Sequence, residues 1–131
     1  MSDYLLAPLV AWVLAQGGKY VLDMIRSRSL KAVFLRSGDM PSAHAALVIS
    51  ITTVIALKDG IESSLFGLAA VFAVIVLYDA VNVRRSVGEQ GSVLAKLAPK
   101  AVFKQSKGHL LSEIIVGSLI GVLAGASVMS F

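Results

Sequence analysis

The sequence predicts an all-α integral membrane protein, a single domain built as a bundle of about four transmembrane helices within its 131 residues. Composition and the spacing of charges indicate this class. Hydrophobic residues make up 56% of the chain and charged residues 15%, whereas a soluble domain carries about 25% charged residues because its surface faces water. The charges also gather in short clusters, and the long apolar runs between them have the length that crosses a bilayer.

Four apolar runs define the predicted spans. They cover residues 4–25, 41–57, 63–83 and 110–131, and a helix needs roughly 20 residues to cross the hydrocarbon core. The second run contains the β-branched sequence ISITTVI (49–55), which would favour a strand in water. In a membrane an isolated strand leaves polar backbone groups unpaired, so we expect a helix there as well.

The loops predict the orientation. Segments 26–39 and 84–107 are rich in Lys and Arg, whereas the connection 58–62 (KDGIE) is net negative. The positive-inside rule therefore places both basic loops in the cytoplasm, with the protein in the inner or plasma membrane. This distribution also explains the net charge of +4 without a nucleic-acid partner. Apolar residues at helical spacing in 89–107 favour an interfacial helix there, with a solvated linker as the alternative.

A stripe of small residues lies in the fourth span. Gly117, Gly121 and Gly125 form a doubled GxxxG pattern, which lets two helices approach closely. The stripe packs either within the monomer or across a homodimer, and the sequence leaves both open. The chain has no cysteine, which excludes disulfides, thiolate metal sites and a cysteine nucleophile.

Ionisable residues near the cytoplasmic ends of the spans are the candidate functional residues, because charges inside membrane segments are costly and usually functional. They are Lys19, Asp23, His44, Asp79, Arg84, Arg85, His109 and Glu113. Some of them, such as Asp23 or one arginine, have the alternative role of anchoring helix ends at the headgroups. His109 and Glu113 are spaced i,i+4, so on a helix they share a face where the carboxylate can hold the imidazole. The turn SGDMPSAH (37–44) opens a helix, whose N-terminus favours an anion such as phosphate.

Three blocks of the chain resemble a known family. They read GDMPSAHAA (38–46), YDAVNVRRSVGEQ (78–90) and GHLLSEIIVG (108–117), in this order. The first resembles the PSGH-type motif of the type 2 phosphatidic acid phosphatase superfamily. Together they resemble its short divergent branch, described as acid phosphatase/vanadium-dependent haloperoxidase-related. The resemblance implies a hydrolase that needs no metal or other cofactor and removes phosphate from a lipid such as phosphatidate, phosphatidylglycerophosphate or a polyprenyl diphosphate.

The resemblance also implies catalytic roles. His109 matches the histidine that attacks phosphorus and forms a phosphohistidine, and Glu113 stands where an acid orients that histidine. His44 matches the histidine that protonates the leaving group. Asp79 is expected to hold an arginine or His44 by an ion pair.

Phosphate ligands follow from the same comparison. Lys19 and Arg26 have the spacing of the superfamily's KxxxxxxRP motif, with Ser27 in place of the proline. The superfamily's further arginine, six residues before the nucleophile, is replaced by Phe103. The candidates for that missing ligand are Lys104, Arg84 and Arg85. The remaining expected site residues belong to the turn before the second span: Ser42 on the phosphate, with Gly38 and Pro41 in support.

Two other functions stay open from the residues alone. Asp39, Asp79 and Glu113 carry oxygen ligands that suit Mg²⁺ in a metal-dependent membrane phosphotransferase or phosphatase. A small channel, transporter or assembly subunit with a polar vestibule is the non-enzymatic alternative, because intramembrane charges also mark ion paths.

Overall fold

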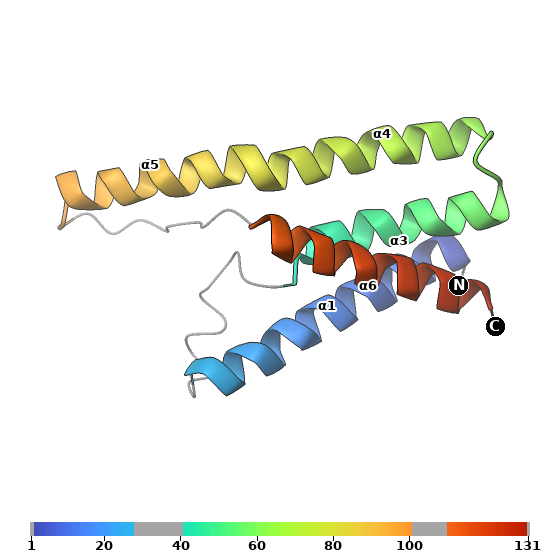
Figure 1. The fold of residues 1–131 in the computed structure, drawn as a ribbon, viewed down its shortest axis with the longest axis horizontal. Coiled ribbons are helices and arrows are strands. Elements are labelled where there is room, and N and C mark those ends of the chain that lie inside the picture. Colours follow the sequence, from blue (N-terminus) through green and yellow to red (C-terminus); the bar gives the residue numbers. More distant parts are fainter. Residues whose placement is uncertain (1, 28–40, 101–109, 131) are drawn as a thin grey trace.

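Every element that the structure describes is a helix, as the sequence predicts. The computed structural model describes residues 2–27, 41–100 and 110–130. Their order along the chain is α1 (Asp3–Ser27), α3 (Ala43–Lys58), α4 (Ser64–Tyr78), the π-helical turn η1 (Asp79–Val83), α5 (Arg84–Leu97) and α6 (Leu111–Met129). Figure 1 shows α4, η1 and α5 following one another along a single long axis, beside a group formed by α1, α3 and α6.

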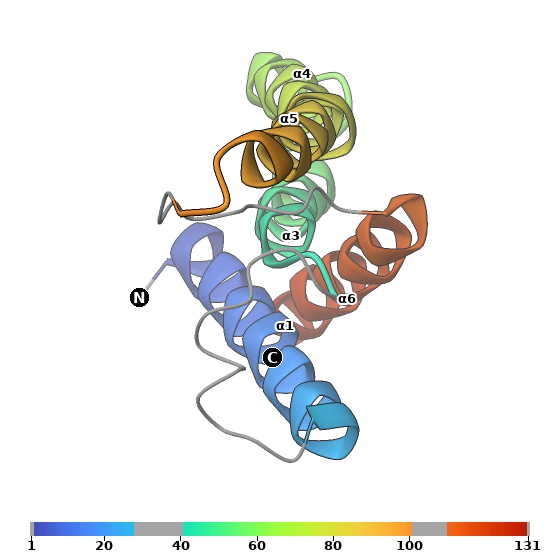
Figure 2. The ribbon, with the colours of Figure 1, turned by 90° about the vertical axis from the view of Figure 1, so that its left-hand side faces the viewer.

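Helix α3 occupies the centre of the bundle. It packs against α1, α4 and α6, and Figure 2 shows it between these helices. Within the described residues, three segments are long and apolar enough to cross a membrane: Asp3–Arg26, Ser64–Leu97 and Leu111–Met129. The helix at the second predicted span is shorter than these three segments. Helix α3 has 16 residues and therefore extends about 24 Å. The helical membrane bundle is thus confirmed, with a short apolar helix at its core.

Glycines allow α3 and α6 to pack backbone against backbone. A Cβ atom at Gly121 would lie 2.6 Å from the carbonyl oxygen of Ala46, and one at Gly125 would lie 2.8 Å from that of Ser50. A Cβ at Gly117 would overlap the carbonyl oxygen of Ser42. The stripe predicted from the sequence therefore packs within the chain. A homodimer through the same stripe would require α3 to leave it.

At the end of the bundle where α3 connects to α4, side-chain contacts join the start of α1 to the end of α3. Lys58 Nζ lies 2.6 Å from Asp3 Oδ2, and the Tyr4 hydroxyl donates to Asp59 Oδ2 at 2.7 Å. The Lys58 ammonium also lies 5.0 Å from the centre of the Tyr4 ring. The short connection to α4 turns at Gly60, whose φ of +87° favours glycine.

The helix that contains the third predicted span continues beyond residue 83. The segment Ser64–Leu97 is 34 residues long, or about 51 Å at helical rise, against a hydrocarbon core of roughly 30 Å. The helix expected inside 89–107 is thus a direct continuation of the third span that ends at Leu97, and no residue of α5 is buried. Its location at a membrane interface remains a prediction, and 101–107 lie outside the described residues.

Candidate functional site

The start of α3 is held by one hydrogen bond within its own first turn and by another to α6. Ser42 is the N-cap, with extended backbone (φ −73°, ψ 109°), and its hydroxyl accepts from the Ala45 N–H at 3.4 Å. The Ser42 N–H donates to the backbone carbonyl of Glu113 at 3.1 Å. Both arrangements satisfy groups that a helix terminus leaves without an intrahelical partner. The Ser42 side chain is fully buried and caps the helix, and its expected contact with phosphate remains a prediction.

Four elements meet around this helix start. A Cβ atom at Gly18 of α1 would lie 3.8 Å from the Pro41 ring. On the other side, Ala45 packs with Ala80 of η1 and Ile114 of α6 in one buried cluster. The small residues Gly18, Ala45 and Ala80 let the helices approach each other. The segments that carry the predicted site residues therefore converge, although they are far apart in the sequence.

A π-helical turn, which the sequence pattern did not predict, interrupts the long helix beside the start of α3. The Arg84 N–H donates to the carbonyl oxygen of Asp79, five residues earlier. Arg84 Nε also lies 3.2 Å from Asp79 Oδ2. In an α-helix, residues five apart point about 140° away from each other, so the π turn is what brings the two side chains together. Local π-helical turns of this kind are frequent at functional sites.

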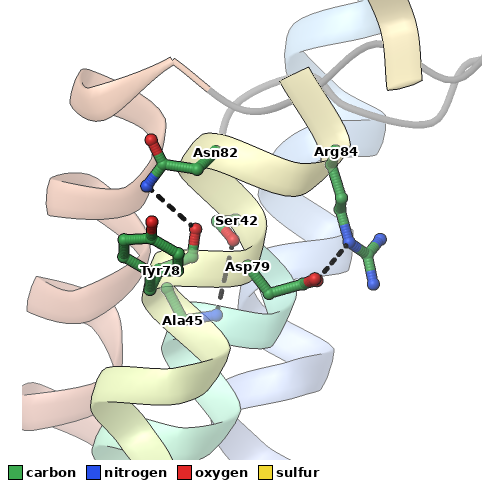
Figure 3. Close-up of polar contacts among 6 residues, drawn as sticks. All are labelled: Ser42, Ala45, Tyr78, Asp79, Asn82 and Arg84. Carbon is green, nitrogen blue, oxygen red and sulfur yellow. Dashed lines mark hydrogen bonds and ion pairs between the residues drawn. The ribbon is translucent and has the colours of Figure 1, made fainter. Parts of the chain in front are cut away.

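The side-chain amide of Asn82 contributes to the same turn. It donates to the Tyr78 carbonyl oxygen at 3.3 Å. Figure 3 shows Tyr78 and Asn82 on one side of the helix and Asp79 with Arg84 on the other. The turn thus has a side-chain to backbone hydrogen bond on one side and an ion pair on the other.

Glu113 lies in the first turn of α6 and caps the start of that helix. Its buried carboxylate accepts from the Leu110 N–H at 2.9 Å, where the helix dipole favours a negative charge. Leu110 has extended backbone (φ −73°, ψ 154°) and α6 begins at Leu111. His109 lies outside the described residues, so its expected pairing with Glu113 remains a prediction.

The remaining predicted residues differ in exposure. Lys19 is half-buried in α1, whereas Arg26, in the last turn of that helix, is exposed. His44 is exposed in the first turn of α3. Arg85 pairs with Glu89 one turn along α5, with Nε and Oε1 3.1 Å apart. The predicted residues outside the described ranges are Gly38, Asp39, Lys104 and His109.

Comparison with known proteins identifies the family. The sequence profile described as "Divergent PAP2 family" matches residues 1–124. The chain belongs to the divergent PAP2 family. It is also 38% identical, over 140 aligned residues, to the "Uncharacterized membrane protein YuiD" of Bacillus subtilis (strain 168), with 91% of this chain and 89% of that protein covered. No solved structure matches the chain.

Membership in the divergent PAP2 family confirms the resemblance based on the three sequence blocks. The described part of the first block forms the start of α3, and the second forms the end of α4, η1 and the first turns of α5. The third reaches the described part of the chain at Leu110 and opens α6. The blocks that carry the family resemblance therefore meet at one end of this PAP2-related membrane protein. Within the described residues there is no group of three or more His, Cys, Asp or Glu side chains that could hold a metal ion.

Proposed function

We propose that the protein hydrolyses a phosphomonoester or diphosphate of a membrane lipid at the cytoplasmic face. The observation that carries the proposal is the meeting of α1, η1 and α6 around the start of α3. These elements bring Lys19 and Arg26 of α1 and the arginines that follow η1 to the same end as a helix N-terminus. Cations and a helix N-terminus both attract a phosphate group, so their convergence favours a phosphorylated substrate.

The substrate is a lipid phosphate in this proposal because the candidate residues lie at the ends of membrane helices. A lipid keeps its phosphate at the headgroup layer while its chains remain in the bilayer. The polar end of the bundle meets that layer if the basic segments 26–39 and 84–107 are cytoplasmic. Phosphatidate, phosphatidylglycerophosphate and polyprenyl diphosphates share this chemistry.

The proposed reaction has two steps. A ring nitrogen of His109 attacks phosphorus and the bond from phosphorus to the leaving oxygen breaks, while His44 donates a proton to that oxygen. Water then attacks the phosphohistidine, and the P–N bond breaks to release phosphate and restore the histidine. In this proposal Glu113 orients His109 and stabilises the positive charge that develops on its ring.

Positive groups hold the phosphate oxygens during both steps. Lys19 and Arg26 of α1 are the first two proposed cations, and Ser42 belongs to the turn that opens α3. A third cation comes from Arg84, Arg85 or Lys104. Donors held in place before the reaction stabilise the charge that develops on the oxygens, and this is usually the largest contribution to catalysis.

A phosphate-release assay on the purified protein in lipid nanodiscs tests the proposal. We expect release from at least one of the three lipid phosphates in the presence of EDTA, and loss of release in His109→Ala. Rapid quench with ³²P-labelled substrate should trap an acid-labile, base-stable phosphoprotein in the wild type and not in His109→Ala. Asp59→Asn, at the far end of the bundle, is the matched control and should retain turnover.

Three outcomes would contradict the proposal. Activity that EDTA abolishes and Mg²⁺ restores would favour the metal-dependent enzyme. Phosphate trapped on an aspartate would exclude the histidine nucleophile. No release from any lipid phosphate, with a folded protein, would favour a transporter or assembly subunit.

A further inference from the structure

We infer that Arg84, rather than its neighbour Arg85, is the arginine that binds the phosphate group, and that Asp79 positions it through the π-helical turn. The inference rests on the proposed function only in taking a phosphate group as the ligand. It concerns two adjacent residues of the same charge, so sequence spacing alone does not choose between them.

The two arginines have different partners. Arg84 pairs with Asp79 inside η1 and its side chain is 42% exposed, whereas the Arg85 side chain is 67% exposed. The partner of Arg85 is Glu89, further along α5 at an ordinary i,i+4 spacing. An exposed pair of this kind is typical of a solvated helix surface. Arg84 is instead tied back to the turn that packs on the core.

Asp79 is held next to the start of α3. The following residue, Ala80, is buried against Ala45 in the first turn of that helix. Figure 3 shows Asp79 and Arg84 on the side of η1 where the ribbon of α1 is drawn, with Ser42 and Ala45 behind the turn. The packing of Ala80 on Ala45 therefore keeps the Asp79–Arg84 ion pair close to the start of α3.

The contact with Asp79 also orients the guanidinium group. Asp79 accepts from Nε, and Figure 3 shows the two terminal nitrogens of Arg84 directed away from that carboxylate. Two such N–H donors side by side match two oxygens of a phosphate. An α-helical register would separate Asp79 from Arg84 by about 140° around the helix, so the π turn is required for this orientation.

Phosphate binding and turnover by single variants test the inference. The wild type in nanodiscs should gain thermal stability from inorganic phosphate, and Arg84→Ala should lose that gain and raise KM for the lipid phosphate roughly 10- to 100-fold. Arg84→Lys keeps the charge but loses the paired donors, so its KM should rise less than that of Arg84→Ala. This milder variant still tests the inference if Arg84→Ala does not fold. Arg85→Ala should raise KM much less than Arg84→Ala. Lys96→Ala, further along α5, is the matched control and should behave as the wild type.

Two variants of Asp79 separate positioning from a structural role. Asp79→Asn should raise KM severalfold with kcat and thermal stability near those of the wild type, because the arginine remains but is no longer held. Asp79→Arg combined with Arg84→Asp restores opposite charges at the two positions. A purely structural ion pair would be rescued by this exchange, whereas a phosphate-binding Arg84 would not.

The possible results distinguish this inference from the proposed function. Stabilisation by phosphate that depends on Arg84, without any turnover, would sink the proposed function and support the inference. The inference is overturned if Arg85→Ala has the larger effect, if the exchanged pair restores phosphate binding, or if phosphate does not stabilise the wild type.

Discussion

The two ends of α3 use polar residues in different ways. At the Lys58 end, charges of α1 and α3 pair with each other across exposed contacts, Lys58 with Asp3 and Asp59 with Tyr4. At the Ser42 end, the buried Ser42 hydroxyl and Glu113 carboxylate accept from backbone N–H groups. The ion pair of Arg84 with Asp79 lies on the neighbouring helix. The Ser42 end thus adds buried side-chain contacts to ion pairs that are at least as exposed as the pair at the Lys58 end.

This difference has an energetic consequence. Exposed ion pairs contribute little to stability because water screens them. Contacts at the Ser42 end involve Glu113, which is 7% exposed, and glycines that touch carbonyl groups of α3. Buried polar groups and close backbone packing tolerate change poorly. We therefore expect substitutions to have large effects at the Ser42 end and along α6, and small ones at the Lys58 end.

The contrast between the Ser42 end and the Lys58 end requires that they face opposite sides of the membrane. The chain has no cysteine, so single cysteines report sidedness without background. Ser27→Cys and Ser92→Cys should react with an impermeant maleimide from the cytoplasmic side, and Glu62→Cys only from the opposite side. Glu62 is a better reporter than the neighbouring Gly60, whose positive φ disfavours a side chain. Labelling of all three positions from one side would contradict the predicted orientation.

The largest graded effect is expected for His44, in the first turn of α3. His44→Ala should reduce release of phosphate from the lipid roughly 10²- to 10⁴-fold, the usual contribution of a general acid. An aryl phosphate has a leaving group that needs no proton, so its hydrolysis should fall much less. The ratio of the two rates is the measurement. An equal loss on both substrates would show that His44 does not act as the acid.

Packing along α6 provides the next test. Gly121→Leu places a side chain where a Cβ atom alone would lie 2.6 Å from a backbone oxygen, and overpacking of this kind costs about 1–3 kcal/mol or more. Gly67→Ala on α4 is the matched control, because its Cβ would meet no atom within 4 Å. Thermal unfolding should show a large fall in Tm for the first variant and none for the second. Equal Tm values would mean that α3 and α6 are not packed through the glycines.

The smallest effect is expected at the Lys58 end. Lys58→Met removes an exposed ion pair and the contact with the Tyr4 ring, while the methionine keeps an apolar stem. Phosphate release should stay at the wild-type rate and Tm should shift only slightly. A loss of turnover comparable to that of His44→Ala would show that the two ends are coupled, and the contrast between them would then be wrong.

Part of the candidate site was accessible from the sequence, because its signals are local. His44, Asp79 and Glu113 were found as ionisable residues near the ends of apolar runs, and the described elements that carry them do meet. The pairing of Asp79 with Arg84 was open between several partners, since helical spacing gives no reason to favour a residue five positions away. The sequence did not indicate where α6 begins, because its start depends on the extended backbone of Leu110.

The sequence by itself determined the helical membrane class, the approximate spans and the family, because hydropathy and motif spacing are properties of contiguous residues. Only the tertiary structure decided three features. These are the residues that the glycine stripe contacts, the length of the helix that contains the third span, and the position of its π turn. Gly121 packs on Ala46 and Ala80 packs on Ala45, and each contact joins segments distant in the chain. A helix has the same hydrophobic pattern whichever neighbouring helix covers it. Packing between distant segments therefore decides which helices are neighbours and where a helix departs from α-helical geometry.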